Sequence, residues 1–462
     1  MTTQTIEHLP TTRFADSARA VDGVATDAAA FDAWLADCRD RFRNTVSPRP
    51  LDALQGWSVD PRTGDVGHVS GRFFTVRGLD VHLPGAAVDH WQQPIISQPE
   101  AGILGILVKE FDGVLHCLMQ AKVEPGNVNG VQLSPTVQAT RSNYSGVHRG
   151  KAVPYLEHFR DTAPHRVLAD VLQSEQGAWF HRKRNRNLIV EATGPVEVLD
   201  GFCWLTLGQI HRLLGEDDLV NMDTRTVLSC FPAAVPDTRH AEAGPSYGEL
   251  LRWVTEERTR RERHVREIPL NSVTGWQLSD GRITHRDGLF FDVVGVSVEA
   301  AGREVGHWDQ PLLAPHGTGL VALLVREIDG VPHVLLHART EVGNLDVLEL
   351  GPTVQCTPQT YTHLPPEARP RFLDTVLQAP PDRVLFSAVH SEEGGRFLHA
   401  RTRYVILQAD PGLSLADCPD YRWTALHDTA ALLRHSNYLN IQARSILACL
   451  HGLAGRNGRE TS

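Results

Sequence analysis

Apolar residues recur at helical spacing near the start of each half of this chain. One face of the first such stretch carries Phe31, Trp34, Leu35 and Cys38. The spacing predicts a helix that runs from this stretch toward Pro50, and a second helix from Trp253 toward Pro269. Two further helices are predicted at residues 205–214 and 224–230.

Strand-like segments lie between these helices. Residues 102–108 and 114–121 are apolar-rich runs joined through Asp112-Gly113, and the second half repeats this arrangement around Asp329-Gly330. An Asp-Gly pair between two such runs is a strong hairpin signal, because a type I′ turn needs positive φ at both central residues. Strands are also predicted at residues 136–140 and 187–192. Because strands and helices are intermixed, the pattern predicts an α+β fold with a mixed sheet.

The second half of the chain repeats the first. Matching pieces include Gly56-Trp57 with Gly275-Trp276, Glu124-Pro125-Gly126-Asn127 with Glu341-Val342-Gly343-Asn344, and Pro135-Thr136-Val137-Gln138 with Pro352-Thr353-Val354-Gln355. The offset between the copies is nearly constant, which indicates a tandem duplication. We expect an N-terminal arm at residues 1–25, a first unit at 26–230, a Pro- and Ala-rich linker at 231–246 and a second unit at 247–462.

Composition narrows the class of protein. The chain has 462 residues, 41% of them hydrophobic, which is enough for two buried cores. It contains no apolar run of membrane-spanning length and no signal-peptide pattern, so we expect a cytoplasmic protein that binds no membrane. The net charge of −10 disfavours nucleic-acid binding. Seven cysteines without a C-x-x-C pair indicate neither a disulfide framework nor a zinc site.

Neutral polar and aromatic residues form the first group of candidates for ligand binding. Gln138 and Thr140 share one face of a predicted strand, as do Gln355 and Thr357 in its copy. Such a row suits sugar hydroxyls or the edge of a thymine, although the solvated face of a sheet is the alternative. Four tryptophans beside turn residues could stack on a base or sugar, with core packing as the alternative: Trp57, Trp91, Trp276 and Trp308.

Arginines form the second group of candidates, for an anionic ligand. Two pairs, each spaced two apart on a predicted strand, could clamp a diphosphate: Arg184 with Arg186, and Arg401 with Arg403. Arg225 and Arg444 each follow an asparagine by four residues, Asn221 and Asn440, so that each Asn and Arg share one helical face and could hold pyrophosphate or ribose. Solvated surface cations are the alternative for isolated pairs.

The two copies differ most after the polar strand. The first unit continues with Arg141, Ser142, Asn143 and Tyr144, and then with His148, Lys151 and Tyr155. The second unit shares only a tyrosine, Tyr361, and lacks the basic and amide groups. We interpret this difference as a catalytic pocket in the first unit, with the second pocket binding weakly or serving an interface.

Three runs carry a resemblance to a known family. Residues 73–78, 120–127 and 134–144, the last reading Ser-Pro-Thr-Val-Gln-Ala-Thr-Arg-Ser-Asn-Tyr, resemble the NDP-hexose 2,3-dehydratases of deoxysugar biosynthesis. The resemblance covers nearly the whole chain and implies a Nudix-like fold in each half, a homodimer, and dTDP-4-dehydro-6-deoxy-α-D-glucose as substrate. The sequence lacks the Glu-rich helix with which Nudix hydrolases bind Mg²⁺, which argues against metal-dependent pyrophosphate cleavage.

The implied reaction needs no cofactor. A ketone at C4 acidifies the hydrogen on C3, so a base can remove it while an acid helps the C2 hydroxyl to leave. Tyr144, Lys151 and Glu175 are the catalytic candidates, with His148 and His158 as other possible bases. The diketone product is expected to be unstable, which implies functional coupling to an NADPH-dependent 3-ketoreductase. A degenerate Nudix hydrolase and a non-catalytic tandem nucleotide-sugar binding protein are the alternatives.

Overall fold

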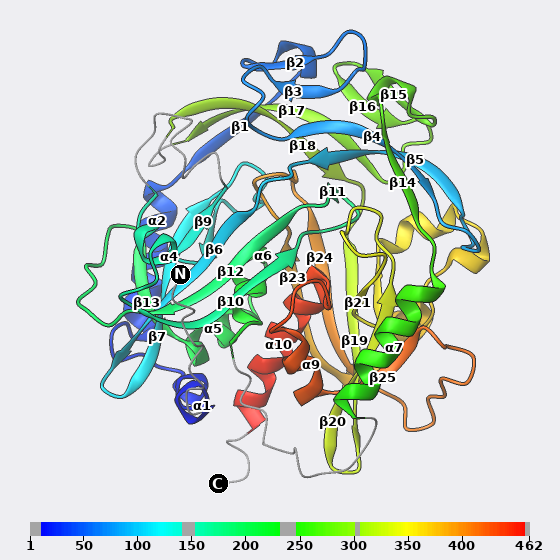
Figure 1. The fold of residues 1–462 in the computed structure, drawn as a ribbon. Coiled ribbons are helices and arrows are strands. Elements are labelled where there is room, and N and C mark those ends of the chain that lie inside the picture. The colour runs from blue at the N-terminus through cyan, green and yellow to red at the C-terminus, as the bar shows by residue number, and fades with distance from the viewer. Residues whose placement is uncertain (1–10, 141–152, 232–245, 301–304, 458–462) are drawn as a thin grey trace.

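The computed structural model describes residues 11–140, 153–231, 246–300 and 305–457, and within them the strands form four sheets (Figure 1). Two seven-stranded sheets, one per unit, form the centres of the molecule. We call them the first and second core sheets. In each, one neighbouring pair of strands is parallel and the others are antiparallel, so the predicted α+β class with mixed sheets is confirmed. The likeness of each unit to a Nudix fold stays an expectation.

The core sheets have equivalent strands in equivalent order. The first contains β6 (Gly102–Phe111), β7 (Val114–Val123), β8 (Val131–Ser134), β9 (Val137–Ala139), β10 (Arg166–Ser174), β12 (Arg184–Glu191) and β13 (Phe202–Thr206). The second contains β19 (Gly319–Ile328), β20 (Val331–Arg339), β21 (Glu349–Gly351), β22 (Val354–Cys356), β23 (Val384–Ser391), β24 (Arg401–Gln408) and β25 (Tyr421–Ala425). Both predicted hairpins are confirmed, because Asp112, Gly113, Asp329 and Gly330 all have positive φ.

Helices join the two core sheets. The described helices are α1 (Thr11–Arg19), α2 (Ala28–Arg41), α4 (Glu157–Arg160), α5 (Leu207–Leu213), α6 (Met222–Leu228), α7 (Tyr247–Arg260), α8 (Leu373–Leu377), α9 (Leu426–Leu432) and α10 (Ile441–Asn457). Short 3-10 helices lie at Leu51–Ala53, Leu270–Ser272, Pro358–Thr362, Pro366–Ala368 and Pro381–Arg383. Helix α6 packs on the first core sheet, α10 packs on the second, and the two helices pack on each other. One hydrophobic cluster therefore runs through both units, and it includes Ile106, Val227, Leu336 and Ile446.

The remaining two sheets exchange a strand between the units. Strand β1 (Asn44–Arg49) of the first unit pairs antiparallel with β17 (Phe291–Ala300) of the second, and β14 (His264–Ile268) of the second pairs with β4 (Thr75–His82) of the first. The five-stranded sheet also contains β15 (Trp276–Ser279), β16 (Arg282–His285) and β18 (His307–Pro315). The six-stranded sheet also contains β2 (Trp57–Val59), β3 (Val66–His68), β5 (His90–Ser97) and β11 (Phe180–His181). Figure 1 shows these two sheets together at the top of the view.

The opening helix of each unit is shorter than predicted, because the residues that follow it form an exchanged strand. The helices end at Arg41 and Arg260 instead of running to Pro50 and Pro269, and the residues that follow form β1 and β14. Each of these strands pairs with a strand of the other unit, so the sequence around it did not indicate a strand. The helix predicted at residues 205–214 begins at Leu207, because Leu205 belongs to β13 and Thr206 caps the helix.

Two glycine turns fasten the units to each other through the backbone. The amide of Gly126 donates to the carbonyl of Gly394 at 2.7 Å, and the carbonyl of Gly126 accepts from the amide of His399 at 2.9 Å. The equivalent turn repeats this, since Gly343 donates to the carbonyl of Gly177 at 2.7 Å. A Cβ atom at Gly126 would lie 1.7 Å from a backbone oxygen of the other unit. The repeated Gly-Asn turn is therefore a contact that only glycine permits.

Two buried arginines add side-chain bonds across the same boundary. Arg225 is fully buried and donates to the carbonyls of Val220 at 2.7 Å and Ser391 at 3.1 Å. Arg444 donates to the carbonyls of Leu439 and Ser174 in the same way. Buried arginines are rare unless paired, and here each arginine binds one backbone oxygen of its own unit and one of the opposite unit.

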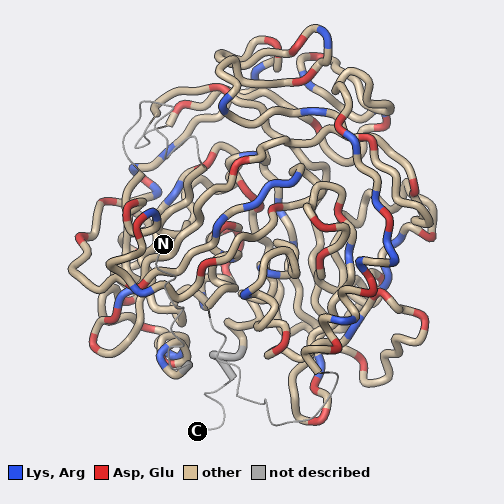
Figure 2. The backbone as a smooth tube through the Cα atoms, viewed as in Figure 1, with Lys and Arg blue, Asp and Glu red and all other residues tan. Residues whose placement is uncertain are grey.

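The N-terminal helix α1 packs on the first core sheet. Phe14 of α1 is buried, and Arg13 forms ion pairs with Glu110 and Glu191 of the first core sheet at 2.6 Å each. Basic and acidic residues are interspersed along the backbone of both units (Figure 2). Among the described residues, no helix has the length and apolar character needed to cross a membrane.

Replacing Gly126 with alanine tests the backbone contact between the units. We expect Gly126→Ala to destabilise the protein by at least about 3 kcal/mol, because a methyl group cannot occupy the space of a carbonyl oxygen. Gly194→Ala is the control, since a Cβ there meets no atom within 4 Å. The measurement is the denaturant midpoint of each variant, and equal midpoints for the two variants would contradict the proposed constraint.

Candidate active site

Two cavities lie at equivalent places in the two units. The first cavity has a volume of about 490 Å³ and is lined from the first unit by residues that include Lys122, Glu124, Gln138, Glu175, Lys183 and Asp223. The second unit completes its wall with His307, Trp308, Asp309, Gln310, Glu393 and Arg396. The second cavity, of about 940 Å³, is lined mainly by the second unit and completed by residues of the first, including Trp91, Gln176 and Trp179. Each cavity is thus built from both units.

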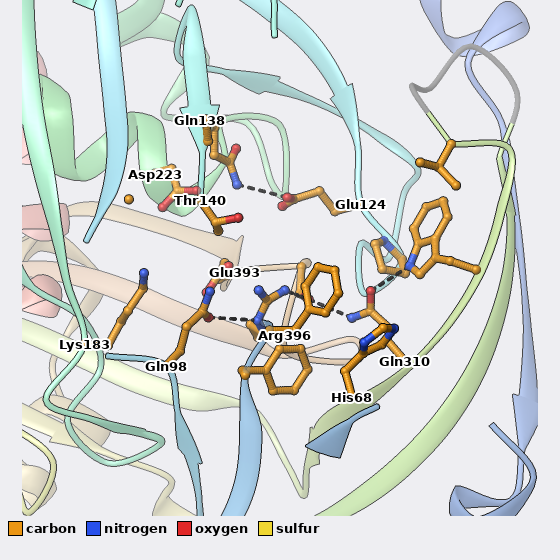
Figure 3. Close-up of a pocket in the computed structure, with 18 of the residues that line it drawn as sticks. His68, Gln98, Glu124, Gln138, Thr140, Lys183, Asp223, Gln310, Glu393 and Arg396 are labelled. Atoms are coloured by element: carbon orange, nitrogen blue, oxygen red, sulfur yellow. Dashed lines mark hydrogen bonds between the residues drawn. The ribbon is translucent and has the colours of Figure 1, made fainter. Parts of the chain in front are cut away.

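A hydrogen-bonded amide forms the same frame in both cavities. In the first, Gln138 donates to Glu124 Oε1 at 2.9 Å (Figure 3). The Oε1 atom of Gln138 accepts from Ser134 Oγ at 3.0 Å and from Asn221 Nδ2 at 3.2 Å. Asn221 is also the N-cap of α6, so the helix start fixes the orientation of Gln138. In the second cavity, Gln355 donates to Glu341 Oε1 at 2.5 Å and accepts from Asn440 at 2.8 Å.

The two cavities differ in their ionisable residues. Lys183, Asp223, Glu393 and Arg396 line the first cavity. The equivalent positions of the repeat hold Ala400, Gln442, Gln176 and Trp179, and all four line the second cavity. At these four positions the first cavity therefore has ionisable side chains and the second has neutral ones.

Burial shifts the pKa values of the acids in the first cavity upward. Burial raises the pKa of Glu175 to about 8, and the charge of Glu393 adds to the rise. Burial, followed by the charges of Glu393 and Glu175, raises the pKa of Asp223 well above its ordinary value. Burial also raises the pKa of Glu393, although Arg396 opposes the shift. Protonated carboxyl groups are thus accessible near neutral pH, as acid catalysis requires.

Glu175 has one fixed and one unpartnered oxygen. Asn185 donates to its Oε1, whereas its buried Oε2 has no hydrogen-bond partner among the described residues. The neighbouring Lys183 donates to the carbonyl of Glu100 at 2.7 Å, and burial lowers the pKa of this lysine. The Oε2 atom of Glu175 is therefore the oxygen available for a ligand or a proton.

Arg396 brings a positive charge from the second unit. Its Nε donates to Gln98 Oε1 at 3.2 Å, and its Nη1 donates to the carbonyl of Gly395 at 2.7 Å. The guanidinium also lies over the ring of Phe74, 4.3 Å from the centroid. Lys122 of the first unit also lines the cavity and donates to the carbonyl of Gln138 at 3.3 Å.

The four predicted tryptophans divide between the cavities. Trp57 and Trp308 line the first, and Trp91 and Trp276 line the second. Trp57 also joins the units, because its Nε1 donates to the carbonyl of Asp309 at 2.7 Å, and Trp276 makes the equivalent bond to Gln92 at 3.2 Å. Their indoles therefore have a packing role in addition to any contact with a ligand.

The other predicted residues fall into three groups. Those that line a cavity are Gln138, Thr140 and Glu175 in the first, and Gln355, Thr357, Tyr361 and Arg401 in the second. Those that line neither are Arg184, Arg186, Arg225, Arg403, Asn440 and Arg444. Those outside the described residues are Arg141, Ser142, Asn143, Tyr144, His148 and Lys151. His158 contacts His165 at 2.9 Å and lines neither cavity.

Four of the five predicted arginines outside the cavities are held by partners of their own. Arg186 forms a two-pronged ion pair with Asp170, at 2.7 and 2.6 Å, and Arg403 donates to Ser387 Oγ at 3.1 Å. Arg225 and Arg444 bind backbone carbonyls between the units. We do not keep these four arginines in the proposed site, because their donors serve protein partners.

Sequence reasoning missed Lys122, Lys183, Asp223, Glu393 and Arg396. A signal was present, since four of these positions are charged in one copy of the repeat and neutral in the other. The described residues include no group of three or more His, Cys, Asp or Glu side chains arranged to hold a metal ion. The arrangement is instead one of proton donors and acceptors beside cations, which suits acid-base chemistry on an anionic substrate.

Comparisons with known proteins show the family of this chain. The sequence model of the NDP-hexose 2,3-dehydratase family matches residues 28–231 and again residues 247–450. A dTDP-4-dehydro-6-deoxy-alpha-D-glucopyranose 2,3-dehydratase from Amycolatopsis orientalis is 50% identical over 450 residues, covering 96% of this chain and 94% of the relative. Proteins of the same name from Saccharopolyspora spinosa and Streptomyces violaceoruber are 47% and 48% identical, covering 96% and 93% of this chain and 95% and 98% of theirs. The chain belongs to the NDP-hexose 2,3-dehydratase family.

Proposed function

We propose that this chain removes the C2 hydroxyl and the C3 hydrogen of dTDP-4-dehydro-6-deoxy-α-D-glucose, and that the first cavity is the place of reaction. The observation that carries the proposal is the difference between the two cavities. They share one polar frame, but at four equivalent positions the first cavity holds a lysine, two acids and an arginine where the second holds neutral residues. The substrate is the one named for the relatives from three organisms.

The acids of the first cavity match the two proton transfers of the reaction. Removal of the C3 hydrogen needs a base, and loss of the C2 oxygen as water needs an acid. Glu175, whose pKa is raised to about 8, lies among acids that can act as a proton donor when protonated or as a base when ionised at neutral pH. Lys183 can donate a hydrogen bond to the C4 oxygen, where negative charge develops as the C3 proton leaves.

The cations of the same cavity suit the diphosphate of the substrate. Lys122 of the first unit and Arg396 of the second unit both line the cavity. A cavity of ionised carboxylates would repel a diphosphate, but the raised pKa values of Glu175, Asp223 and Glu393 reduce that negative charge. Tyr144 and Lys151 remain proposed catalytic residues, because their segment follows Thr140 of the cavity wall.

We also propose two partners for this protein, a reductase that consumes its product and a second copy of the chain. A 3,4-diketone is reactive, so an NADPH-dependent 3-ketoreductase is the class of enzyme that would consume it. A homodimer is the assembly that the family resemblance implies. A cytoplasmic location completes the proposal.

Product analysis tests the proposed reaction. The purified protein is incubated with dTDP-4-dehydro-6-deoxyglucose, a 3-ketoreductase and NADPH, without added metal. We expect mass spectrometry to detect a dTDP-2,6-dideoxyhexos-4-ulose. Unchanged substrate would favour a binding protein, and release of dTMP would favour a hydrolase; either result would reject the proposal.

A pair of equivalent substitutions tests which cavity reacts. Glu175→Gln should lower kcat by about 10²- to 10⁴-fold, because it removes a proton-transfer group. Glu392→Gln changes the equivalent residue of the second cavity and should leave kcat within about threefold of wild type. Steady-state kinetics with the coupled reductase measures both. A larger loss from Glu392→Gln than from Glu175→Gln would place the chemistry in the second cavity.

A further inference from the structure

In each unit, one turn has two consecutive residues whose side chains line different cavities. In the first unit, Glu175 lines the first cavity while the next residue, Gln176, lines the second. In the equivalent turn of the second unit, Glu392 lines the second cavity and Glu393 lines the first. Each cavity therefore receives the first residue of its own turn and the second residue of the opposite turn.

The second cavity shows how these two positions meet. Gln176 Nε2 donates to Glu392 Oε2 at 2.7 Å, and both side chains are buried. In the first cavity, the same two positions hold Glu393 and Glu175. A carboxylate cannot donate a hydrogen bond as glutamine does. Glu175 and Glu393 can therefore form the equivalent hydrogen bond only if one of the two carboxyl groups carries a proton.

We propose that Glu175 and Glu393 form a carboxyl pair that shares one proton and supplies both the base and the acid of the dehydration. The inference rests on the proposed function of the first cavity and adds a catalytic residue from the second unit. Asn185 occupies Oε1 of Glu175, whereas its buried Oε2 has no hydrogen-bond partner among the described residues and is the oxygen that can carry a proton.

Other charged groups surround the pair and set its titration. Glu175 also faces Lys183 and Arg444, and Glu393 also faces Lys122, Lys183, Arg396 and Glu124. Asp223 faces both members. Burial and the negative charge of Glu393 both raise the pKa of Glu175, whereas Lys183 and Arg444 lower it. The pair as a whole therefore titrates in two steps, which belong to neither residue alone.

The reaction balances with one shared proton. The ionised member takes the C3 proton, and the electrons of that C–H bond form the C2–C3 double bond as the C2–O bond breaks. The protonated member gives its proton to the departing oxygen, which leaves as water. The pair is again singly protonated, and the sugar is an enol of a 3,4-diketone. That enol loses the proton of its C3 hydroxyl and gains one at C2 to give the 2-deoxy diketone.

Glu393→Gln is the test, because it gives the first cavity the same Gln and Glu that the second cavity already accommodates. We expect kcat to fall by about 10²- to 10⁴-fold while the unfolding midpoint stays near that of wild type. The wild-type profile of kcat/KM against pH should be bell-shaped, since the pair lacks a base when doubly protonated and an acid when doubly ionised. In the variant the alkaline limb should disappear, because no second carboxyl group remains to ionise, and the acid limb should remain, because Glu175 must still lose its proton to act as a base.

Two further variants keep the test decisive. Glu393→Asp retains the carboxyl group and should retain both limbs of the profile with reduced kcat, whether or not the glutamine variant folds. Gln176→Glu places a carboxyl pair in the second cavity and should leave kcat within about threefold of wild type. The proposed carboxyl pair would be rejected if the Glu393→Gln enzyme kept a near wild-type kcat and an unchanged dependence of kcat/KM on pH. It would also be rejected if the Glu393→Asp enzyme lost one limb of that pH profile. Failure of wild type to form product would instead reject the proposed function.

Discussion

Backbone hydrogen bonds between the two units are the constraint on which the rest of this structure depends. Strands β1 and β14 each complete a sheet of the opposite unit, and Gly126 and Gly343 each bond to a turn of the opposite unit. Removing either unit would leave edge strands unpaired and buried amides unsatisfied. The two copies of the repeat are therefore one folding body, although each has its own core sheet.

The same interlocking explains why the first cavity is lined by distant parts of the chain. The turn that accepts the Gly126 amide also carries Glu393 and Arg396 into the first cavity. Because the contact is made by backbone atoms, the side chains of that turn are free to differ between the copies. Duplication thus provided two cavities with one frame, and changes at a few side chains gave the first cavity its acids and cations. The chemistry that we propose depends on charges held in a frame that is common to both cavities.

The sequence predicted the parts of this molecule that local pattern controls. The duplication, the two Asp-Gly hairpins and the α+β class all follow from periodicity, and Gln138, Thr140 and Glu175 do line the first cavity. The exchanged strands did not follow from local pattern, because β1 and β14 pair with segments more than a hundred residues away. Arg225 and Arg444 were misplaced because a buried arginine that binds carbonyls has the same local spacing as one that binds phosphate. Glu393 was missed because its cavity belongs to the other copy.

The central claim is that a few ionisable side chains, held by a shared frame, make one of two equivalent cavities catalytic. The most direct test is the turnover of a chain carrying Lys183→Ala, Asp223→Gln and Glu393→Gln together, which are the residues that the second cavity holds at these positions. We predict that this chain folds with a cooperative unfolding transition and forms no detectable dideoxyhexosulose in the coupled assay. Turnover near the wild-type rate would contradict the account.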